Sequence, residues 1–343
     1  MPSRQRRQEA LWATGEAARS GEPQPGAEVE EPTPVAEAVH VGRATVLVGT
    51  CSWTDPTLVK ETNWYPRRTM TAGERLRYYA SRFPLVEADS TYYRPLSPDL
   101  ARSWAERAPD GFIFNIKAYG LLTGHPVSPA TLWPDIRELV DRPDGPPGRA
   151  YAHHLPAEAL DEAWARFVEA LGPLDRKGRL GAVLLQYPPW FVPKRANREE
   201  LARLPGRLGG LTGCVELRSP KWTAEDERGR TLDLLRQLGL ALVVVDAPAA
   251  SGLQALTEVT RDDLAVVRFH GRADSTWNAR NVSAAERFRY LYSDAELAEW
   301  VPRARRLAQL ASRVHLLMNN CYQDYGARNA AQLAEMLAAG PGD

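Results

Sequence analysis

The sequence predicts an α/β fold, a parallel (β/α)8 barrel of the TIM type, and three observations support this prediction. Eight apolar segments of strand length follow one another along the chain. Most of them are continuous apolar runs, as in strands that are buried on both faces. Helical patterns separate most of the segments, and alternating strands and helices favour a parallel sheet covered by helices.

The first 42 residues differ from the rest, and we expect them to form a disordered tail. Segments 21–26 and 30–34 are rich in Pro and Glu and poor in branched apolar residues. A segment of this composition cannot bury enough apolar surface to offset the entropy lost on ordering. The expected organisation is therefore a tail, 1–42, followed by one barrel domain, 43–340.

The strands and helices of the expected barrel can be assigned from their periodicity. The predicted strands are 44–49, 85–90, 112–117, 181–186, 213–217, 240–246, 264–269 and 314–319. The predicted helices are 71–82, 98–107, 157–171, 197–208, 226–238, 294–311 and 327–338. Thr71, Ser97 and Ser293 are suitable N-caps for three of these helices.

Two connections depart from the regular alternation. Segment 247–263, after the sixth strand, is short, so we expect a turn there in place of a full helix. Segment 118–156 contains a loop rich in Pro and Gly and predicts a long excursion over the C-terminal end of the barrel. An open doubly wound sheet is the main alternative fold, but residues 49–53 lack the glycine spacing of a phosphate-binding turn.

The amino-acid composition limits the classes of function that fit this chain. The chain has 43 basic and 43 acidic residues, so no bulk charge attracts nucleic acid or an anionic membrane. No apolar run reaches the roughly 18 residues that span a bilayer, and no apolar segment of a secretory signal follows the N-terminal arginines. Three widely spaced cysteines suit a reducing compartment. We expect a soluble, cytoplasmic protein without a membrane or nucleic-acid partner.

Polar residues occur at the C-terminal ends of the predicted strands, which is where barrel enzymes place their chemistry. The predicted catalytic residues are Glu87, Lys117, Glu216, Asp246 and His270. The predicted ligand-binding residues are Asp89, Tyr92, Gln186, Arg218, Arg268, Asn319 and Asn320. Residues two apart in a strand share a face, so acidic and basic groups should meet in one place and form acid/base pairs. The structural alternative is a buried ion-pair network, such as Glu87–Lys117 or Glu216–Arg268.

Individual residues allow more than one role. His270 is the preferred acid/base group because its ordinary pKa lies near neutrality, although it could simply orient a carboxylate. Lys117 is expected to form an ion pair that binds substrate, or, if desolvated, to act as a Schiff-base nucleophile. Aromatic residues after strand ends could stack on a sugar or base, or pack the rim of the barrel. These aromatic residues are Trp53, Tyr92, Tyr187, Trp190 and Trp222.

A divalent metal is an open alternative at the same place. Glu87, Glu216, Asp246 and His270 supply oxygen and imidazole donors. No closely spaced His/His or His/Glu motif marks a metal site, however, and Lys117, Arg218 and Arg268 suit an anion better. We therefore expect a small polar or anionic ligand, and the sequence does not indicate an oligomeric state.

A series of short motifs carries a resemblance to a known family. The motifs are GTCSW (49–53), VEADSTYY (86–93), LLQYPPWF (184–191), VELRSPKW (215–222), VVVDAP (243–248), VVRFHGR (266–272) and NNCYQDYGARNA (319–330). In order and spacing, from about Val46 to about Leu337, the chain resembles the DUF72 family, the YecE-like proteins. The resemblance implies a TIM-type barrel and supplies no reaction. The chain departs from the family pattern at three places. Asp89 stands where Asn is common, Gly124 separates Thr123 from His125 where the family often has these two adjacent, and Cys321 stands where a His often follows the paired Asn.

The leading functional hypothesis is an enzyme of the hydrolase, lyase or isomerase type that acts on a small polar or anionic ligand by general acid/base chemistry. One alternative is a metal-dependent barrel that processes nucleic acid. Another is a barrel that binds a ligand without catalysis, which a fold alone does not exclude.

Overall fold

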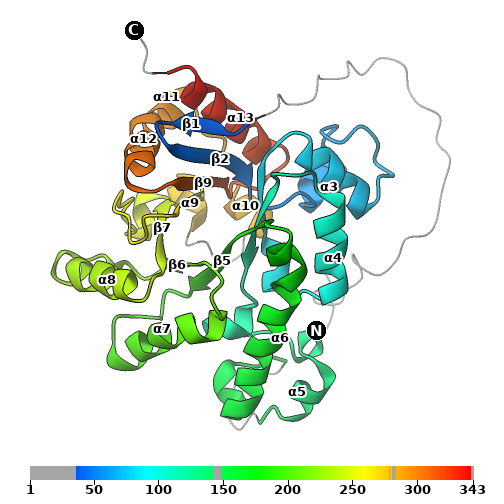
Figure 1. Ribbon diagram of the computed structural model, residues 1–343, viewed down its shortest axis with the longest axis vertical. Helices are drawn as coiled ribbons and strands as arrows, with labels where there is room; N and C mark the ends of the chain where they lie inside the picture. Colours follow the sequence, from blue (N-terminus) through cyan, green and yellow to red (C-terminus); the bar gives the residue numbers. More distant parts are fainter. Residues whose placement is uncertain (1–35, 142–147, 278, 280–282, 341–343) are drawn as a thin grey trace. The chain divides into compact units, whose positions relative to one another are not determined.

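The structure is a computed structural model and describes residues 36–141, 148–277, 279 and 283–340. In these residues, eight parallel strands pair in chain order, and β2 pairs with β9 to close a barrel (Figure 1). The barrel strands are β2 (Ala44–Thr50), β3 (Leu85–Ala88), β4 (Ile113–Lys117), β5 (Leu180–Tyr187), β6 (Gly213–Leu217), β7 (Ala241–Asp246), β8 (Ala265–Phe269) and β9 (Arg313–Met318). The predicted TIM-type barrel is confirmed.

All eight predicted strands are present, and their ends differ from the predicted ones by at most two residues. The largest difference is in β3, which ends at Ala88 because residues Asp89–Tyr92 turn into a 3₁₀ helix, η1. The Thr91 hydroxyl fixes this turn, since Oγ1 lies 2.8 Å from the carbonyl oxygen of Ala88 and 2.6 Å from that of Lys117. The turn that follows β3 is therefore tied to the end of β4.

Helices surround the strands, as Figure 1 shows for α3, α4, α6, α7, α8, α12 and α13. The helices are α2 (Pro56–Glu61), α3 (Ala72–Ala80), α4 (Pro98–Arg107), α5 (Pro134–Glu138), α6 (Ala157–Arg176), α7 (Arg195–Leu208), α8 (Glu225–Gln237), α9 (Asp274–Trp277), α10 (Ala284–Arg287), α11 (Asp294–Ala298), α12 (Trp300–Leu310) and α13 (Tyr325–Ala338). Thr71 and Ser293 cap their helices in capping boxes with Glu74 and Glu296, and Ser97 accepts a hydrogen bond from the Leu100 N–H, as predicted.

One predicted helix is divided in two. Residues 294–311 form α11 and α12, with Glu299 between them. Pro302 has no N–H to donate to the carbonyl of Ala298, the last residue of α11, so the usual bond across this point is absent. The connection 247–264, all of which is described, contains only a 3₁₀ turn, η6 (Ala249–Ser251), which agrees with the expected loss of a helix there.

The strands separate two apolar layers. The inner layer fills the barrel and contains strand side chains such as Leu85, Leu184 and Val243. The outer layer contains the alternate strand residues, such as Val244, together with helix side chains such as Trp164. Successive side chains of a strand therefore alternate between the inside of the barrel and the helix layer. Residues separated by an even number of positions in one strand lie on the same face.

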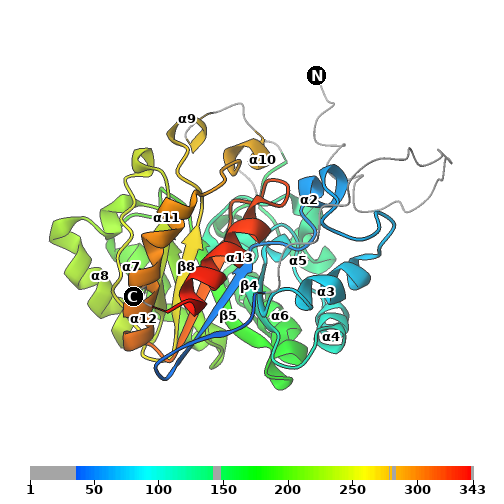
Figure 2. The same ribbon diagram turned by 90° about the horizontal axis from the view of Figure 1, so that it is seen from above.

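The connections at the two ends of the barrel differ in length. At the N-terminal end, β1 (Val39–Val41) pairs antiparallel with β2 in a short hairpin. At the opposite end, α9 and α10 follow β8, as Figure 2 shows. The described parts of segment 118–156 hold only short elements, which are η2 (Gly120–Thr123), η3 (Pro129–Thr131), α5 and η4 (Ala152–His154). The predicted excursion after β4 is thus present.

The predicted tail overlaps the folded part of the chain. Residues 1–35 lie outside the described residues, so the expected disorder there remains a prediction. Residues 39–41 of the same predicted tail form β1, so ordered structure begins before residue 43. A tripeptide strand of this kind gives little periodic signal, which is why the sequence pattern missed it. No helix in the described part of the chain is long and apolar enough to cross a membrane.

Candidate functional site in the barrel mouth

Most of the predicted site residues lie on the inner face of the strands, at the C-terminal end of the barrel. We call these residues the mouth cluster: Glu87, Asp89, Lys117, Gln186, Glu216, Arg218, Arg268, His270 and Asn319. The strand members follow from parity, because each is an even number of residues from an inner apolar residue such as Leu85, Cys214 or Val266. Hydrogen bonds and ion pairs connect the deeper members directly.

Arg268 lies at the bottom of the cluster between two glutamates. Its Nη2 atom is 2.6 Å from Oε1 of Glu87, and its Nη1 atom is 2.5 Å from Oε2 of Glu216. All three side chains are fully buried. Burial alone would raise the pKa of Glu216, but Arg268 beside it holds that pKa well below its ordinary range. Glu216 and Arg268 therefore both stay charged at neutral pH.

Arg218 and His270 extend the network from Glu216 toward solvent. The Nη1 atom of Arg218 lies 2.7 Å from Oε1 of Glu216 and 3.1 Å from Nε2 of His270. Nδ1 of His270 lies 2.6 Å from Nδ2 of Asn319, and Nε2 also lies 3.3 Å from Oε1 of Glu216. Because an amide nitrogen only donates, Nδ1 is its acceptor, and the proton of a neutral ring is then on Nε2, where the Glu216 carboxylate accepts it.

The buried position of His270 changes its expected chemistry. Burial lowers the pKa of His270 to about 3, although Glu216 beside it acts in the opposite direction. The ring is therefore neutral at physiological pH, and its acid form is almost absent. The sequence-based choice of His270 as the principal acid/base group rested on an ordinary pKa near neutrality, which this environment does not allow. The environment suits the alternative role, a neutral ring that orients the Glu216 carboxylate.

Asp89 and Lys117 lie above the deep network and remain partly exposed. Neither side chain makes a hydrogen bond or ion pair within the described residues, although their charges act on each other. Burial raises the pKa of Asp89 to about 7, while Lys117 acts to lower it and Glu87 to raise it. Burial, together with the positive charge of Arg268, lowers the pKa of Lys117. These two groups are the ionisable side chains of the mouth that are left open.

Aromatic rings border the side chains of Asp89 and Lys117, which we call the open pair. The Lys117 ammonium lies 4.4 Å from the ring centroid of Tyr92, and Tyr92 packs edge-on against His125 at 5.2 Å. Trp190, which is 60% exposed, lies 6.0 Å from the His125 ring. The Arg218 guanidinium lies 4.7 Å over the ring of Trp277 in α9. The mouth therefore combines charged groups with apolar ring surface.

The other predicted aromatic residues have a packing role. Trp53 contacts Trp104 edge-on, and Tyr187, Phe191 and Trp222 form a stack. Trp53, Tyr187 and Trp222 are buried in the outer apolar layer. For these three residues, the interpretation as rim packing is the one that fits the structure.

Two predicted site residues, Asp246 and Asn320, face away from the mouth. Val245 and Asn319 are the residues of β7 and the β9 end that face inward, so their neighbours face the helices. Asp246 accepts hydrogen bonds from Tyr292 Oη at 2.7 Å and from Trp300 Nε1 at 2.6 Å. The Asn320 amide nitrogen donates to the carbonyl of Tyr290 and to the Asn329 amide oxygen. Asp246 and Asn320 were predicted as mouth residues, although each comes one position after an inward-facing residue. A step of one position along a strand places a side chain on the opposite face of the sheet.

His125 and Trp277 were not among the predicted site residues. Both come from connections, where no strand or helix periodicity indicates which way a side chain points. His125 directly follows Gly124, which has a φ of 78° and ends η2. That turn could have identified the segment as a fixed loop. Trp277 stands in a four-residue helix, for which the sequence has no distinct signal.

The donor set of the mouth suits ion pairing better than metal binding. Arg268 occupies the space between Glu87 and Glu216, the two carboxylates that a metal would need. Asp246, a third proposed donor, faces the helices. Within the described residues, no group of three or more His, Cys, Asp or Glu is placed to hold a metal ion.

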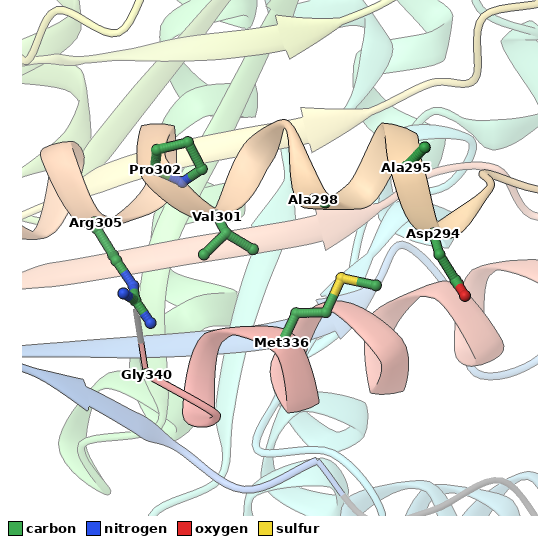
Figure 3. A pocket seen from close by; sticks show the side chains of 8 residues that line it. All are labelled: Asp294, Ala295, Ala298, Val301, Pro302, Arg305, Met336 and Gly340. Atoms are coloured by element: carbon green, nitrogen blue, oxygen red, sulfur yellow. The ribbon is translucent and has the colours of Figure 1, made fainter. Parts of the chain in front are cut away.

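A separate groove lies on the outside of the barrel. It has a volume of about 660 Å³ and runs between α11, α12 and α13 (Figure 3). Its walls are largely apolar and include Val301, Pro302 and Met336, with Arg305 at one end. No residue of the mouth cluster lines it, so the groove and the charged site are different places.

The fold and the site define a TIM-type barrel protein with a charged, partly open mouth. The family model described as "Protein of unknown function DUF72" matches residues 47–342, and the chain belongs to this family. The resemblance read from the motifs is thereby confirmed.

Similar proteins include members of the same family from several bacteria. UPF0759 protein YunF of Bacillus subtilis is 26% identical over 85% of this chain and 94% of its own length. UPF0759 protein YecE of Escherichia coli is 27% identical over 54% of this chain and 57% of its own length. Two solved structures of DUF72 family proteins have the same fold. The one from Thermotoga maritima has a TM-score of 0.66 at 28% identity, covering 85% of this chain and 98% of that one. The one from Enterococcus faecalis has a TM-score of 0.69 at 24% identity, covering 87% and 97%.

Proposed function

We propose that this chain is an enzyme that acts on a small, polar, anionic molecule by general acid/base chemistry in the mouth of its barrel. The observation that carries the proposal is the open pair, Asp89 and Lys117, above a charge network that is already internally paired. Unpaired, partly buried charges cost stability, so a ligand that engages them is a physical reason for their presence. The three cysteines are free thiols, which supports the cytoplasmic location expected from the sequence.

The roles follow from the surroundings of each group. Asp89, with a pKa of about 7, holds or releases a proton near neutral pH, which is the condition for general acid/base catalysis. Arg218 uses Nη1 for Glu216, and it contacts the Trp277 ring with its face. Its remaining N–H groups are suited to a carboxylate or phosphate of the ligand. Glu87, Glu216 and Arg268 are assigned to holding the charge pattern, with Gln186 and Asn319 as further polar contacts.

A binding experiment tests the proposal without a known substrate. The probes are inorganic phosphate, malonate and ribose 5-phosphate, measured by thermal shift on the wild type and on Arg218→Gln. A probe at about ten times its Kd stabilises the folded state by about 1.4 kcal/mol, or roughly 2–4 °C for a protein of this size. At least one probe should give this shift in the wild type and lose most of it in Arg218→Gln.

The matched control is Arg195→Gln on α7, because Arg195 is 93% exposed and lies outside the mouth. This variant should keep the shift of the wild type. Absence of a shift with all three probes, or a shift that Arg218→Gln retains in full, would contradict the proposed anion site.

A further inference from the structure

The lysines of this chain are few, and one of them occupies an unusual position. The chain has five lysines, at positions 60, 117, 177, 194 and 221. Lys60, Lys177, Lys194 and Lys221 are exposed. Lys117 is partly buried at the end of β4, on the strand face that looks into the barrel. The reactivity of the other four lysines therefore serves as an internal reference when the reactivity of Lys117 is measured.

The backbone around Lys117 holds the neighbouring turn close to its side chain. The Thr91 hydroxyl bonds to the carbonyl oxygen of Lys117, and the same turn carries Asp89 and Tyr92. Gly120 leaves room for the Tyr92 ring, since a Cβ at this position would lie only 3.1 Å from it. The turn thus presents a carboxyl group and an aromatic face to Lys117.

Burial and the positive charge of Arg268 lower the pKa of Lys117, whereas the carboxylates Glu87, Asp89 and Glu216 act to raise it. In the part of the chain that the structure describes, no carboxylate lies within the 4.0 Å of an ion pair with its Nζ atom. Glu87 and Glu216, the deep carboxylates, are paired with Arg268, whose positive charge acts against a second cation. Together with burial, this lowers the pKa of Lys117, so more of its amine is unprotonated than in an exposed lysine.

We propose that Lys117 is a nucleophile that forms an imine with the carbonyl carbon of a small aldehyde or ketone, assisted by the Asp89 carboxyl. The inference rests on the proposed function and narrows its substrate class to carbonyl compounds. It selects the nucleophile role for Lys117 in preference to the ion pair that the sequence favoured, because the expected Glu87–Lys117 pair is absent and Glu87 binds Arg268.

The step balances with the groups present in the mouth. The Lys117 nitrogen forms a bond to the carbonyl carbon while the π electrons move to oxygen, and proton transfer from nitrogen to oxygen gives a carbinolamine. Asp89 in its acid form then donates a proton to the hydroxyl group, the C–O bond breaks and water leaves. The resulting iminium returns one proton to the Asp89 carboxylate, so the net products are the imine and one water molecule. A pKa of about 7 lets Asp89 perform both transfers near neutrality.

Reductive trapping tests the inference on the intact chain. The wild type is incubated near pH 7 with glyoxylate, pyruvate, glycolaldehyde or dihydroxyacetone in the presence of sodium cyanoborohydride, which reduces an imine to a stable amine. Digestion and mass spectrometry then give the rate of labelling at each of the five lysines. An exposed lysine has only about 0.04% free amine at this pH. Lys117 should be labelled at least about tenfold faster than the exposed lysines by at least one probe.

Two variants define the role of each group. Lys117→Arg keeps the positive charge and should lose the label at position 117 without a change at the other four lysines. Asp89→Asn keeps the size of the side chain and should slow labelling of Lys117 by about tenfold or more, since it cannot transfer a proton.

The result that would overturn the inference is labelling of Lys117 that is no faster than that of the exposed lysines with every probe. If anion binding still depends on Arg218 in that case, the proposed site stands and only the imine is wrong. If neither binding nor labelling is observed, both proposals fail.

Discussion

Two groups of buried polar residues at strand ends can be compared, one inside the barrel and one outside it. The outer group consists of Asp246, Arg272, Tyr292 and Trp300. In this group, Asp246 receives hydrogen bonds from Arg272 Nε and Nη2, from the Tyr292 hydroxyl and from the Trp300 indole. In the mouth cluster, Glu87 Oε2 and Arg268 Nε are buried without a partner in the described residues, and Asp89 and Lys117 are unpaired. The outer group is saturated, and the mouth cluster is not.

This difference separates a stabilising network from one suited to a ligand. A buried carboxylate whose acceptor positions are all used has no capacity left for a substrate. Asp246 also fixes the segment after β8, because Arg272, its partner, lies two residues after His270 and the Asp246 carbonyl accepts the His270 backbone N–H. The outer group therefore supports the mouth from behind, while the side chains of Asp89 and Lys117 in the mouth have no ion-pair partner in the described residues.

The largest effect on stability is expected for Arg268→Met. Removing the guanidinium leaves Glu87 and Glu216 as neighbouring buried carboxylates that have lost their shared partner. Breaking a buried pair in this way costs about 3–5 kcal/mol. Urea unfolding followed by circular dichroism should show this loss, and Arg195→Gln at the surface should change the free energy of unfolding by less than about 0.5 kcal/mol. A loss below about 1 kcal/mol in Arg268→Met would mean that Arg268 is not strongly coupled to the two glutamates.

The next largest effect is expected for Asp246→Ala, which tests the outer group. Tyr292, Trp300 and Arg272 lose their common acceptor, and removal of hydrogen bonds to a charged group costs about 2–3 kcal/mol. Labelling of Lys117 by the carbonyl probes should stay within about twofold of the wild type at temperatures where the variant is folded. Loss of labelling in a folded Asp246→Ala protein would show that the outer group and the mouth cluster do not act separately.

The eight strands could be predicted from sequence because burial on both faces gives continuous apolar runs. Parity within those runs also placed Glu87, Glu216, Arg268 and His270 on one face. The pairing could not be predicted in full, since Glu87 binds Arg268 from the far side of the barrel and not the adjacent Lys117. Asp246 and Asn320 could have been excluded by strict use of the same parity, whereas His125 and Trp277 come from loops that carry no periodic signal.

A smaller, pH-dependent effect is expected for Asp89→Asn. Its folded-state pKa is raised from 3.8 to about 7, so the folded chain holds a proton that the unfolded chain has lost between these values. Stability of the wild type therefore falls as pH rises through this window and is level above it. The Asp89→Asn side chain has no proton to lose, so the stability of this variant should not fall in the same pH window. A rise of the pKa from 3.8 to about 7 corresponds to about 4 kcal/mol in a fully buried site, and solvent screening of the partly exposed Asp89 carboxyl reduces this. At pH 8 the variant should be more stable than the wild type by about 1–2 kcal/mol, and at pH 4 the difference should be close to zero.

Unfolding free energies of both proteins from pH 4 to pH 8 measure this dependence. A wild type that gains stability relative to Asp89→Asn as pH rises would mean that Asp89 is held as a paired carboxylate. The open character of the mouth would then be wrong at this residue.

The smallest change in stability is expected for Lys117→Met. The ammonium has no carboxylate partner in the described residues and lies in the positive field of Arg268. A methionine of similar length keeps the contact with Tyr92, so the free energy of unfolding should be unchanged or higher by up to about 1 kcal/mol. The same variant should have no label at position 117. A loss of more than about 2 kcal/mol would show that Lys117 has a structural ion-pair role instead.

The most direct test of the open mouth is the titration of the five lysines in the folded wild type. Protein labelled with ¹³C at the lysine ε carbon gives one resonance for each lysine, and Lys117→Arg identifies the signal of Lys117. We predict that Lys117 loses its proton at clearly lower pH than Lys60, Lys177, Lys194 and Lys221, because it is buried beside Arg268. A midpoint equal to or above that of the four exposed lysines would contradict the open mouth.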